Sequence, residues 1–251
     1  MAGEHSRMNN WFKEIELGCE LPASAAQNLL DSGFVVIPGL VASERLAQLA
    51  QAYDLAVASA APPDLSVGRT TTRVHDFVNR GTEFDELYVN RLVLEACCRV
   101  IGQPFKLSTL LARTLRPRSQ AQPLHVDFRV DADGWPMVGF IVMVDDFRSD
   151  NGATRFVPGS HKWPTIPGDV MKDPASDHEC QVMACGAAGS VIVYIGSVWH
   201  GHTANRSGEP RRSVQGAYIR RDAKPGVDQA ERMLPQTRAR ISPLAKYLLV
   251  V

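Results

Sequence analysis

The chain has 251 residues, of which 45% are hydrophobic and 22% are charged, and these proportions are typical of a globular protein with a substantial core. Lysine plus arginine and aspartate plus glutamate each number 27, so the net charge of zero gives no reason to expect binding to nucleic acid or to an anionic membrane. No run of about 18 apolar residues predicts a membrane-spanning helix, and no apolar segment near the N-terminus predicts a secretory signal. The five cysteines are irregularly spaced, which favours free thiols in the cytoplasm over disulfides or a zinc site.

The N-terminal part of the chain is predicted to be mainly helical. Residues 1–20 are polar and are expected to form a lead-in or one short element, and residues 21–104 a helical shell with a few strands. The first helix is expected to end at Gly33, and Ser43 is a good N-cap for the second. Helices are expected at residues 23–32, 43–60, 83–88 and 92–101, and strands at residues 34–37 and 74–79.

The rest of the chain is predicted to be mainly β. Many short strands with glycine and proline between them favour a sandwich or a barrel closed on itself at residues 105–221. No repeat or low-complexity linker divides the sequence, so residues 1–251 are expected to form a single domain that ends in a C-terminal segment at 222–251. Strands are expected at residues 106–115, 124–130, 137–144, 154–157, 181–185, 190–195 and 213–220.

A His-x-Asp pair lies in the segment Gln122-Pro-Leu-His-Val-Asp-Phe128. If this segment is a strand, His125 and Asp127 project from the same face. An imidazole nitrogen beside a carboxylate oxygen provides two of the three ligands of a mononuclear non-haem iron(II) site. Such pairs are common by chance, so an iron site also needs a third ligand and an anchor for a co-substrate.

Candidates for both roles follow the strand at residues 190–195. His200 and His202 are each able to provide the third ligand, and the 75 residues after His125 are enough for several strands. Arg211 and Ser213 share one face of the next strand, where a guanidinium and a hydroxyl group are suited to bind one carboxylate of a dicarboxylate. The other interpretation of Arg211 is a solvated basic turn.

Six short motifs occur in order between about residue 24 and residue 221: Gly33-Phe-Val-Val-Ile-Pro-Gly39, Gln122-Pro-Leu-His-Val-Asp127, Asp145-Asp146 before Asn151-Gly-Ala153, Val157-Pro-Gly-Ser-His161, Trp199-His-Gly201, and Asn205 with Arg211. Each motif is modest alone. Their order and spacing together resemble those of the phytanoyl-CoA dioxygenase family of iron(II)/2-oxoglutarate oxygenases.

The resemblance implies a mainly β (α+β) fold, a double-stranded β-helix or cupin-like jelly roll with flanking N-terminal helices. It implies iron(II) bound by His125, Asp127 and His200. Related halogenases have a small residue at the position of Asp127, so the carboxylate favours hydroxylation of a C–H bond. That reaction would use O₂ and convert 2-oxoglutarate to succinate and CO₂.

The resemblance also implies how 2-oxoglutarate is bound. Arg211 would bind its far carboxylate, with Ser213 beside it, and His202 would be a neighbour of the co-substrate. The strand at residues 106–115 should contact the keto-acid end, and Thr114 is the candidate there.

Substrate contacts are expected from loops at the mouth of the barrel, and His161 is expected to be structural. No basic cluster is placed for a CoA nucleotide, so the expected substrate is a small or mid-sized hydrophobic or zwitterionic metabolite. The sequence does not indicate the oligomeric state. The candidate contact residues are Trp135, Arg129, Trp163, His75 and Tyr218.

Two other functions remain open on the sequence alone. A cupin-type metalloprotein, either an isomerase or a dioxygenase without 2-oxoglutarate, would use His125, His200 and His202 and would make Arg211 dispensable. A non-catalytic binding protein on the same fold is the other alternative. The complete ligand set argues against it.

Overall fold

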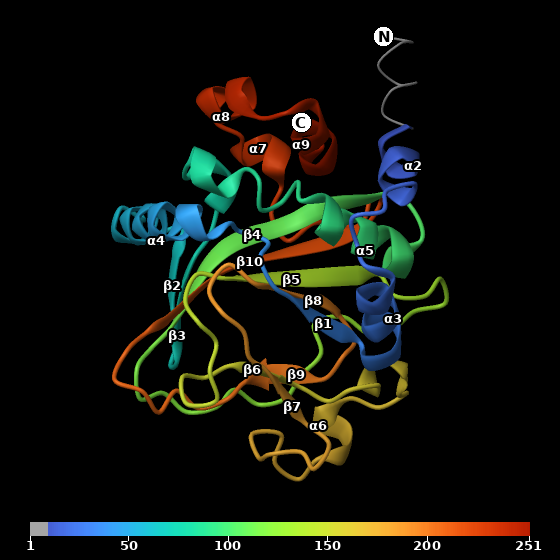
Figure 1. Cartoon of the computed structure of the whole chain (residues 1–251), viewed down its shortest axis with the longest axis vertical. Coiled ribbons are helices and arrows are strands. Elements are labelled where there is room, and N and C mark those ends of the chain that lie inside the picture. The colour runs from blue at the N-terminus through green and yellow to red at the C-terminus, as the bar shows by residue number, and fades with distance from the viewer. Residues whose placement is uncertain (1–9) are drawn as a thin grey trace.

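The computed structural model describes residues 10–251, and it consists of two antiparallel β-sheets that face each other (Figure 1). The major sheet has seven strands in the order β1-β8-β5-β10-β4-β3-β2, and the minor sheet has three in the order β7-β6-β9. This is the predicted double-stranded β-helix. Residues 1–9 of the predicted lead-in lie outside the described residues, and its remainder contains one short helix, Asn10–Glu16.

The strands of the major sheet come from both parts of the chain. Three of them precede residue 105, so the sheet extends beyond the segment predicted as the β core. Within β5 alternate residues face opposite sides: Phe140 packs toward the helices, whereas Ile141 packs toward the minor sheet. The strands are β1 Phe34–Ile37, β2 Leu65–Val67, β3 Thr71–Val74, β4 Phe105–Leu115, β5 Met137–Met143, β6 Thr154–Phe156, β7 Val182–Ala184, β8 Val191–Ile195, β9 His200–His202 and β10 Arg211–Arg220.

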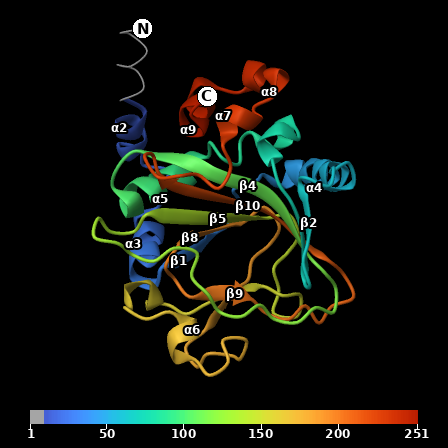
Figure 2. The same ribbon diagram turned by 180° about the vertical axis from the view of Figure 1, so that it is seen from behind.

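Helices cover the outer face of the major sheet. In Figure 2, α2, α3 and α5 lie along one side of the sheet, and α7 to α9 lie beside β4. The apolar side of α5 is buried against β5, β8 and β10. Of these strands, β5 and β8 are buried along their whole length, which is consistent with their almost uninterrupted apolar sequences. The helices are α2 Asn10–Glu16, α3 Ala23–Ser32, α4 Ser43–Ala58, α5 Arg91–Ile101, α6 Pro167–Val170, α7 Gln229–Arg232, α8 Pro235–Arg240 and α9 Pro243–Leu249. None of the helices in residues 10–251 is long and apolar enough to cross a membrane.

Three of the predicted elements are not formed as expected. The segment predicted as a strand at 124–130 forms only a single bridge, at His125. Pro123 has no N–H to donate, and the N–H groups of Asp127 and Phe128 both donate to the carbonyl of Gly196, so regular strand pairing is not possible. Instead of a strand at 74–79, β3 ends at Val74 and a 3-10 turn follows. Residues 83–88 contain only a 3-10 turn at Thr82–Phe84.

Candidate metal centre

Three side chains converge in the space between the two sheets. The Nε2 atom of His125 lies 3.8 Å from Oδ1 of Asp127, and the Nε2 atom of His200 lies 3.7 Å from Oδ2 of the same carboxylate. Their ligand atoms all lie within 4.8 Å of one another, and no other such group of three exists in residues 10–251. Two imidazoles and one carboxylate with room beside them are suited to iron(II).

The backbone brings the two histidines together. The N–H of His125 donates to the carbonyl of His200, and the N–H of His200 donates to the carbonyl of His125, both at 3.0 Å. This antiparallel bridge places the two ring centres 4.4 Å apart. The segment before His125 therefore extends the minor sheet beside β9, although its backbone is not a regular strand.

Backbone carbonyls orient both imidazoles toward the carboxylate. Nδ1 of His125 donates to the carbonyl of Pro123 at 3.1 Å, and Nδ1 of His200 donates to the carbonyl of Val198 at 3.0 Å. Because carbonyls only accept, the proton lies on Nδ1 and the lone pair of Nε2 faces Asp127. Burial, together with repulsion from His200, lowers the pKa of His125 to about 4, so this ring is neutral near pH 7.

One phenol contacts the carboxylate of the group. The hydroxyl of Tyr194 donates to Oδ2 of Asp127 at 2.8 Å. Burial alone would raise the pKa of Asp127, but the nearby His200, this hydrogen bond and His125 together lower it below its ordinary value. Asp127 is therefore an ionised ligand candidate.

A small cavity of about 70 Å³ lies behind these residues and is lined by the buried cation of Arg211. The side chain of Arg211 is 1% exposed, and its Nε and Nη1 have no hydrogen-bond partner among the described residues. Its guanidinium lies 3.9 Å above the ring of Phe147, and burial followed by repulsion from Arg113 lowers its pKa to about 9. A buried guanidinium without a partner is costly, so the cavity is suited to a carboxylate.

The residue of β4 that faces this cavity is Arg113, not the expected Thr114. Arg113 donates from Nη2 to Oε1 of Gln122 at 2.8 Å, whereas the hydroxyl of Thr114 lies 2.8 Å from that of Tyr53 on the helical side. Successive residues of a strand face opposite sides, so the expected register was off by one residue. An arginine between Leu111 and Leu115 on one face of β4 was the available signal.

His202 lines this cavity, and Ser213 lies on the same strand as the lining residues Arg211 and Gln215, but neither belongs to the metal group. Nδ1 of His202 donates to the carbonyl of Thr203 at 2.9 Å, and its Nε2 lies 3.3 Å from the hydroxyl of Thr70. Burial lowers the pKa of His202 to about 3. The hydroxyl of Ser213 donates to the carbonyl of Arg113 on the same face of β10 as Arg211.

A larger cavity of about 460 Å³ opens from the metal group toward solvent. Its walls combine apolar side chains with cations, and Asp127 is its only acid. Of the predicted substrate contacts, only His75 lines it. The apolar lining residues include Leu111, Phe128, Met137 and Ile219, and the cations are Arg73, Arg113 and Lys224.

The other predicted contact residues have structural partners. Tyr218 faces the helices and donates to the carbonyl of Tyr88, and Trp135 donates to the carbonyl of His161. Trp163 packs on Trp199 with ring centres 5.0 Å apart. Arg129 forms an exposed ion pair with Asp169. His161 is buried and lies 3.1 Å from the carbonyl of Leu30, in agreement with the structural role expected for it.

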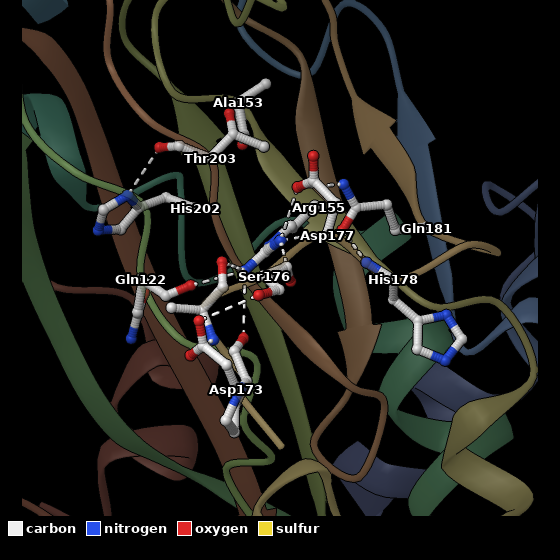
Figure 3. A network of polar contacts seen from close by, with 12 residues as sticks. Gln122, Ala153, Arg155, Asp173, Ser176, Asp177, His178, Gln181, His202 and Thr203 are labelled. Carbon is white, nitrogen blue, oxygen red and sulfur yellow. Dashed lines mark hydrogen bonds and ion pairs between the residues drawn. The ribbon is translucent and has the colours of Figure 1, made fainter. Parts of the chain in front are cut away.

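Arg155 on β6 is fully buried and holds the loop at residues 173–181 (Figure 3). Its two terminal nitrogens contact six oxygens, one of which is the carbonyl of Gln122, three residues before His125. The same loop accepts the N–H of Leu124 at the carbonyl of Pro174, 2.7 Å away. Arg155 therefore connects the loop to the segment that carries the first histidine. Its other oxygen partners lie on Pro174, Ala175, Ser176, Asp177 and Gln181.

Comparison with known proteins gives a consistent result. The dioxygenase cdmA of Talaromyces verruculosus is 36% identical over 40% of this chain and 35% of its own length, and the multifunctional dioxygenase prhA of Penicillium brasilianum is 28% identical over 78% and 71%. The carbocyclase SnoK from nogalamycin biosynthesis has a similar fold, with a TM-score of 0.66 and 18% identity over 89% of this chain and 92% of its own. HygX of Streptomyces hygroscopicus, solved with nickel and 2-oxoglutarate, has a TM-score of 0.64 and 18% identity over 82% and 89%. The family model for phytanoyl-CoA dioxygenase (PhyH) matches residues 29–213, and the chain belongs to this family.

Proposed function

We propose that the protein is an iron(II)- and 2-oxoglutarate-dependent oxygenase that hydroxylates a C–H bond of a small metabolite. The observation that carries this proposal is the buried guanidinium of Arg211 behind His125, Asp127 and His200, whose Nε and Nη1 have no hydrogen-bond partner in residues 10–251. Membership of the phytanoyl-CoA dioxygenase family and the likeness to HygX support the same cofactors.

The residues of the inner cavity fit both groups. His125, Asp127 and His200 would hold iron(II) through Nε2, a carboxylate oxygen and Nε2. Arg211 would bind the far carboxylate of 2-oxoglutarate, with Ser213 beside it on the same face of β10. When bound, iron and 2-oxoglutarate supply the oxidation of a C–H bond by O₂, with release of succinate and CO₂.

The neighbouring polar residues would orient the co-substrate. Arg113 holds the amide oxygen of Gln122, and the amide nitrogen of Gln122 lies 3.4 Å from Nε2 of His125. Both residues line the two cavities, so they lie where the near carboxylate would reach the metal. His202 contributes a neutral ring to the same wall.

The larger cavity would bind the substrate. Its volume of about 460 Å³ is in the range of small-molecule sites. Its apolar walls would contact the carbon skeleton of the substrate, and its cations favour a polar or anionic group on it. A small or mid-sized metabolite fits this description.

Turnover without substrate provides a first test of the proposal. Protein with iron(II), 2-oxoglutarate and O₂ is expected to release succinate slowly, and Asp127→Ala is expected to reduce this release strongly, because it removes one of the three ligands. Asp131→Ala is the matched control, because Asp131 pairs with Arg220 at the surface four residues away. Equal succinate release by wild type and Asp127→Ala would contradict the proposal.

A further inference from the structure

Tyr194 is the one polar side chain of the buried strand β8, and it faces the metal group. Its ring centre lies 4.8 Å from that of His200 and 5.8 Å from that of Phe156. The residue lines both the inner and the outer cavity. Packing against the rings of His200 and Phe156 fixes the position of the Tyr194 ring. The role of its hydroxyl group is a separate question.

That hydroxyl is the only side-chain hydrogen-bond donor to Asp127 among the described residues. Asp127 lies in a bend outside any strand, and its N–H donates to the carbonyl of Gly196. No strand pairing therefore fixes its side chain. A carboxylate rotates about its terminal torsion and presents two equivalent oxygens. The hydrogen bond from Tyr194 to Oδ2 selects one orientation.

The space for the phenol comes from a glycine in the neighbouring strand. Gly139 lies directly opposite Tyr194 in the pairing of β5 with β8. A Cβ atom on Gly139 would lie 2.2 Å from Cζ, 2.4 Å from Cε1 and 2.5 Å from the hydroxyl oxygen of Tyr194. Glycine weakens a strand interior, so its presence in the middle of β5 requires a reason, and the close approach of this ring provides one.

We propose that Tyr194 is the positioning residue that fixes Asp127 in its metal-binding orientation, and that Gly139 is present to let Tyr194 reach it. The inference rests on the proposed function, because it concerns the same metal group. Partners that hydrogen-bond to metal ligands orient them, and their removal typically weakens metal affinity about 10- to 100-fold.

The test is the binding of the metal alone to the folded apoprotein. Anaerobic titration with iron(II), and with cobalt(II) as a spectroscopic substitute, is expected to give dissociation constants about 10- to 100-fold higher in Tyr194→Phe than in wild type. The matched control is Tyr53→Phe, which removes a buried phenol hydroxyl with a similar hydrogen bond, to Thr114, on the other side of the sheet. Tyr53→Phe is expected to keep the wild-type metal affinity.

The two results that would overturn these proposals are distinguishable. If wild type binds iron(II) and Tyr194→Phe binds it equally well within about twofold, the positioning role is wrong and the proposed function stands. If folded wild type binds neither metal, the proposed function itself fails. Circular dichroism and the melting temperature establish that each variant is folded.

A double-mutant cycle tests the role of Gly139. Gly139→Ala is expected to weaken metal binding in the presence of Tyr194, because the added methyl group displaces the ring. In a Tyr194→Leu background the same change is expected to have less than about a twofold effect, because the clashing atoms are gone. Equal effects of Gly139→Ala on metal affinity in both backgrounds would show that Gly139 and Tyr194 are not coupled, and would overturn that part of the inference.

Discussion

Arg211 and Arg212 are adjacent on β10 and face opposite sides of the major sheet. The guanidinium of Arg211 is buried with two N–H groups unpaired among the described residues, whereas that of Arg212 is paired with Asp145 at 2.6 Å and with Asp54 at 2.7 Å. An arginine on one face of the sheet is thus available to an external anion, whereas its neighbour on the other face is neutralised by carboxylates of the protein. This contrast supports a binding role for Arg211 and provides an internal control.

The roles of the two nearby histidines can be separated by metal binding. His200→Ala is expected to lower iron(II) affinity by much more than the about 10- to 100-fold typical of a lost outer partner. His202→Ala is expected to leave metal affinity nearly unchanged, because His202 does not belong to the group of convergent ligand atoms. Calorimetric titration of the apoproteins measures both. A large loss in His202→Ala would favour the cupin-type alternative.

Neighbouring residues of β4 are expected to have different effects. Thr114→Val removes the partner of the Tyr53 hydroxyl and should lower the free energy of unfolding by about 1 kcal/mol, with no change in 2-oxoglutarate affinity. Arg113→Gln should weaken 2-oxoglutarate binding, because Arg113 lines the inner cavity. Denaturant unfolding and ligand titration measure the two effects. Weaker 2-oxoglutarate binding by Thr114→Val would show that Thr114 contributes to the co-substrate site after all.

Arg155 is expected to control the order of the loop at residues 173–181. Arg155→Ala removes all of its contacts with loop oxygens, so trypsin should cleave at the exposed Lys172 at least about tenfold faster than in wild type. The matched control is Arg129→Ala, since the exposed Arg129–Asp169 pair contributes little. Mass spectrometry of the first fragments identifies the site. Unchanged cleavage in Arg155→Ala would show that the loop is held by other contacts.

Two buried histidines predict a loss of stability in acid. Burial lowers the pKa of His161 and of His202 below their unfolded value of about 6.5, so the folded protein holds both neutral. The unfolded chain takes up these protons first. The contribution of these two histidines to the free energy of unfolding of the apoprotein should therefore be complete above about pH 6.5. Below that pH the free energy of unfolding should fall by up to about 1.4 kcal/mol per pH unit for each histidine.

Denaturant unfolding between pH 8 and pH 5 measures this slope, and His161→Gln should make it shallower. Stability that rises toward pH 5 would contradict the assignment of neutral folded-state histidines.

Much of the fold follows from local sequence patterns. The helices at 23–32 and 92–101 follow from glycines at their C-terminal ends and from apolar periodicity, and both are confirmed within one residue. The strand β5 follows from its almost uninterrupted apolar sequence, and it too is confirmed within one residue. The segment that contains His125 was harder to predict, because its apparent alternation is real but Pro123 prevents regular pairing. The two histidines meet through one backbone bridge instead.

The sequence also led to most of the side chains that the structure brings together, but not to their surroundings. His125, Asp127, His200 and Arg211 stand in short motifs with a fixed order. Arg113 depends on the register of β4, and the contact of Tyr194 with Asp127 depends on the pairing of strands far apart in the chain. The contact of Tyr194 arises from tertiary structure and leaves no local pattern, whereas Arg113 was marked only by its place between two leucines on one face of β4.

The most direct test of the account is an anaerobic titration of the iron(II)-loaded protein with 2-oxoglutarate, followed by the weak visible metal-to-ligand charge-transfer band. Wild type and Arg212→Ala are expected to show the band at the same concentrations. Arg211→Ala should need about 10- to 100-fold more 2-oxoglutarate, the cost of losing charge-assisted hydrogen bonds. No band in iron-loaded wild type, or the same titration curve in Arg211→Ala, would contradict the assignment of the inner cavity to 2-oxoglutarate.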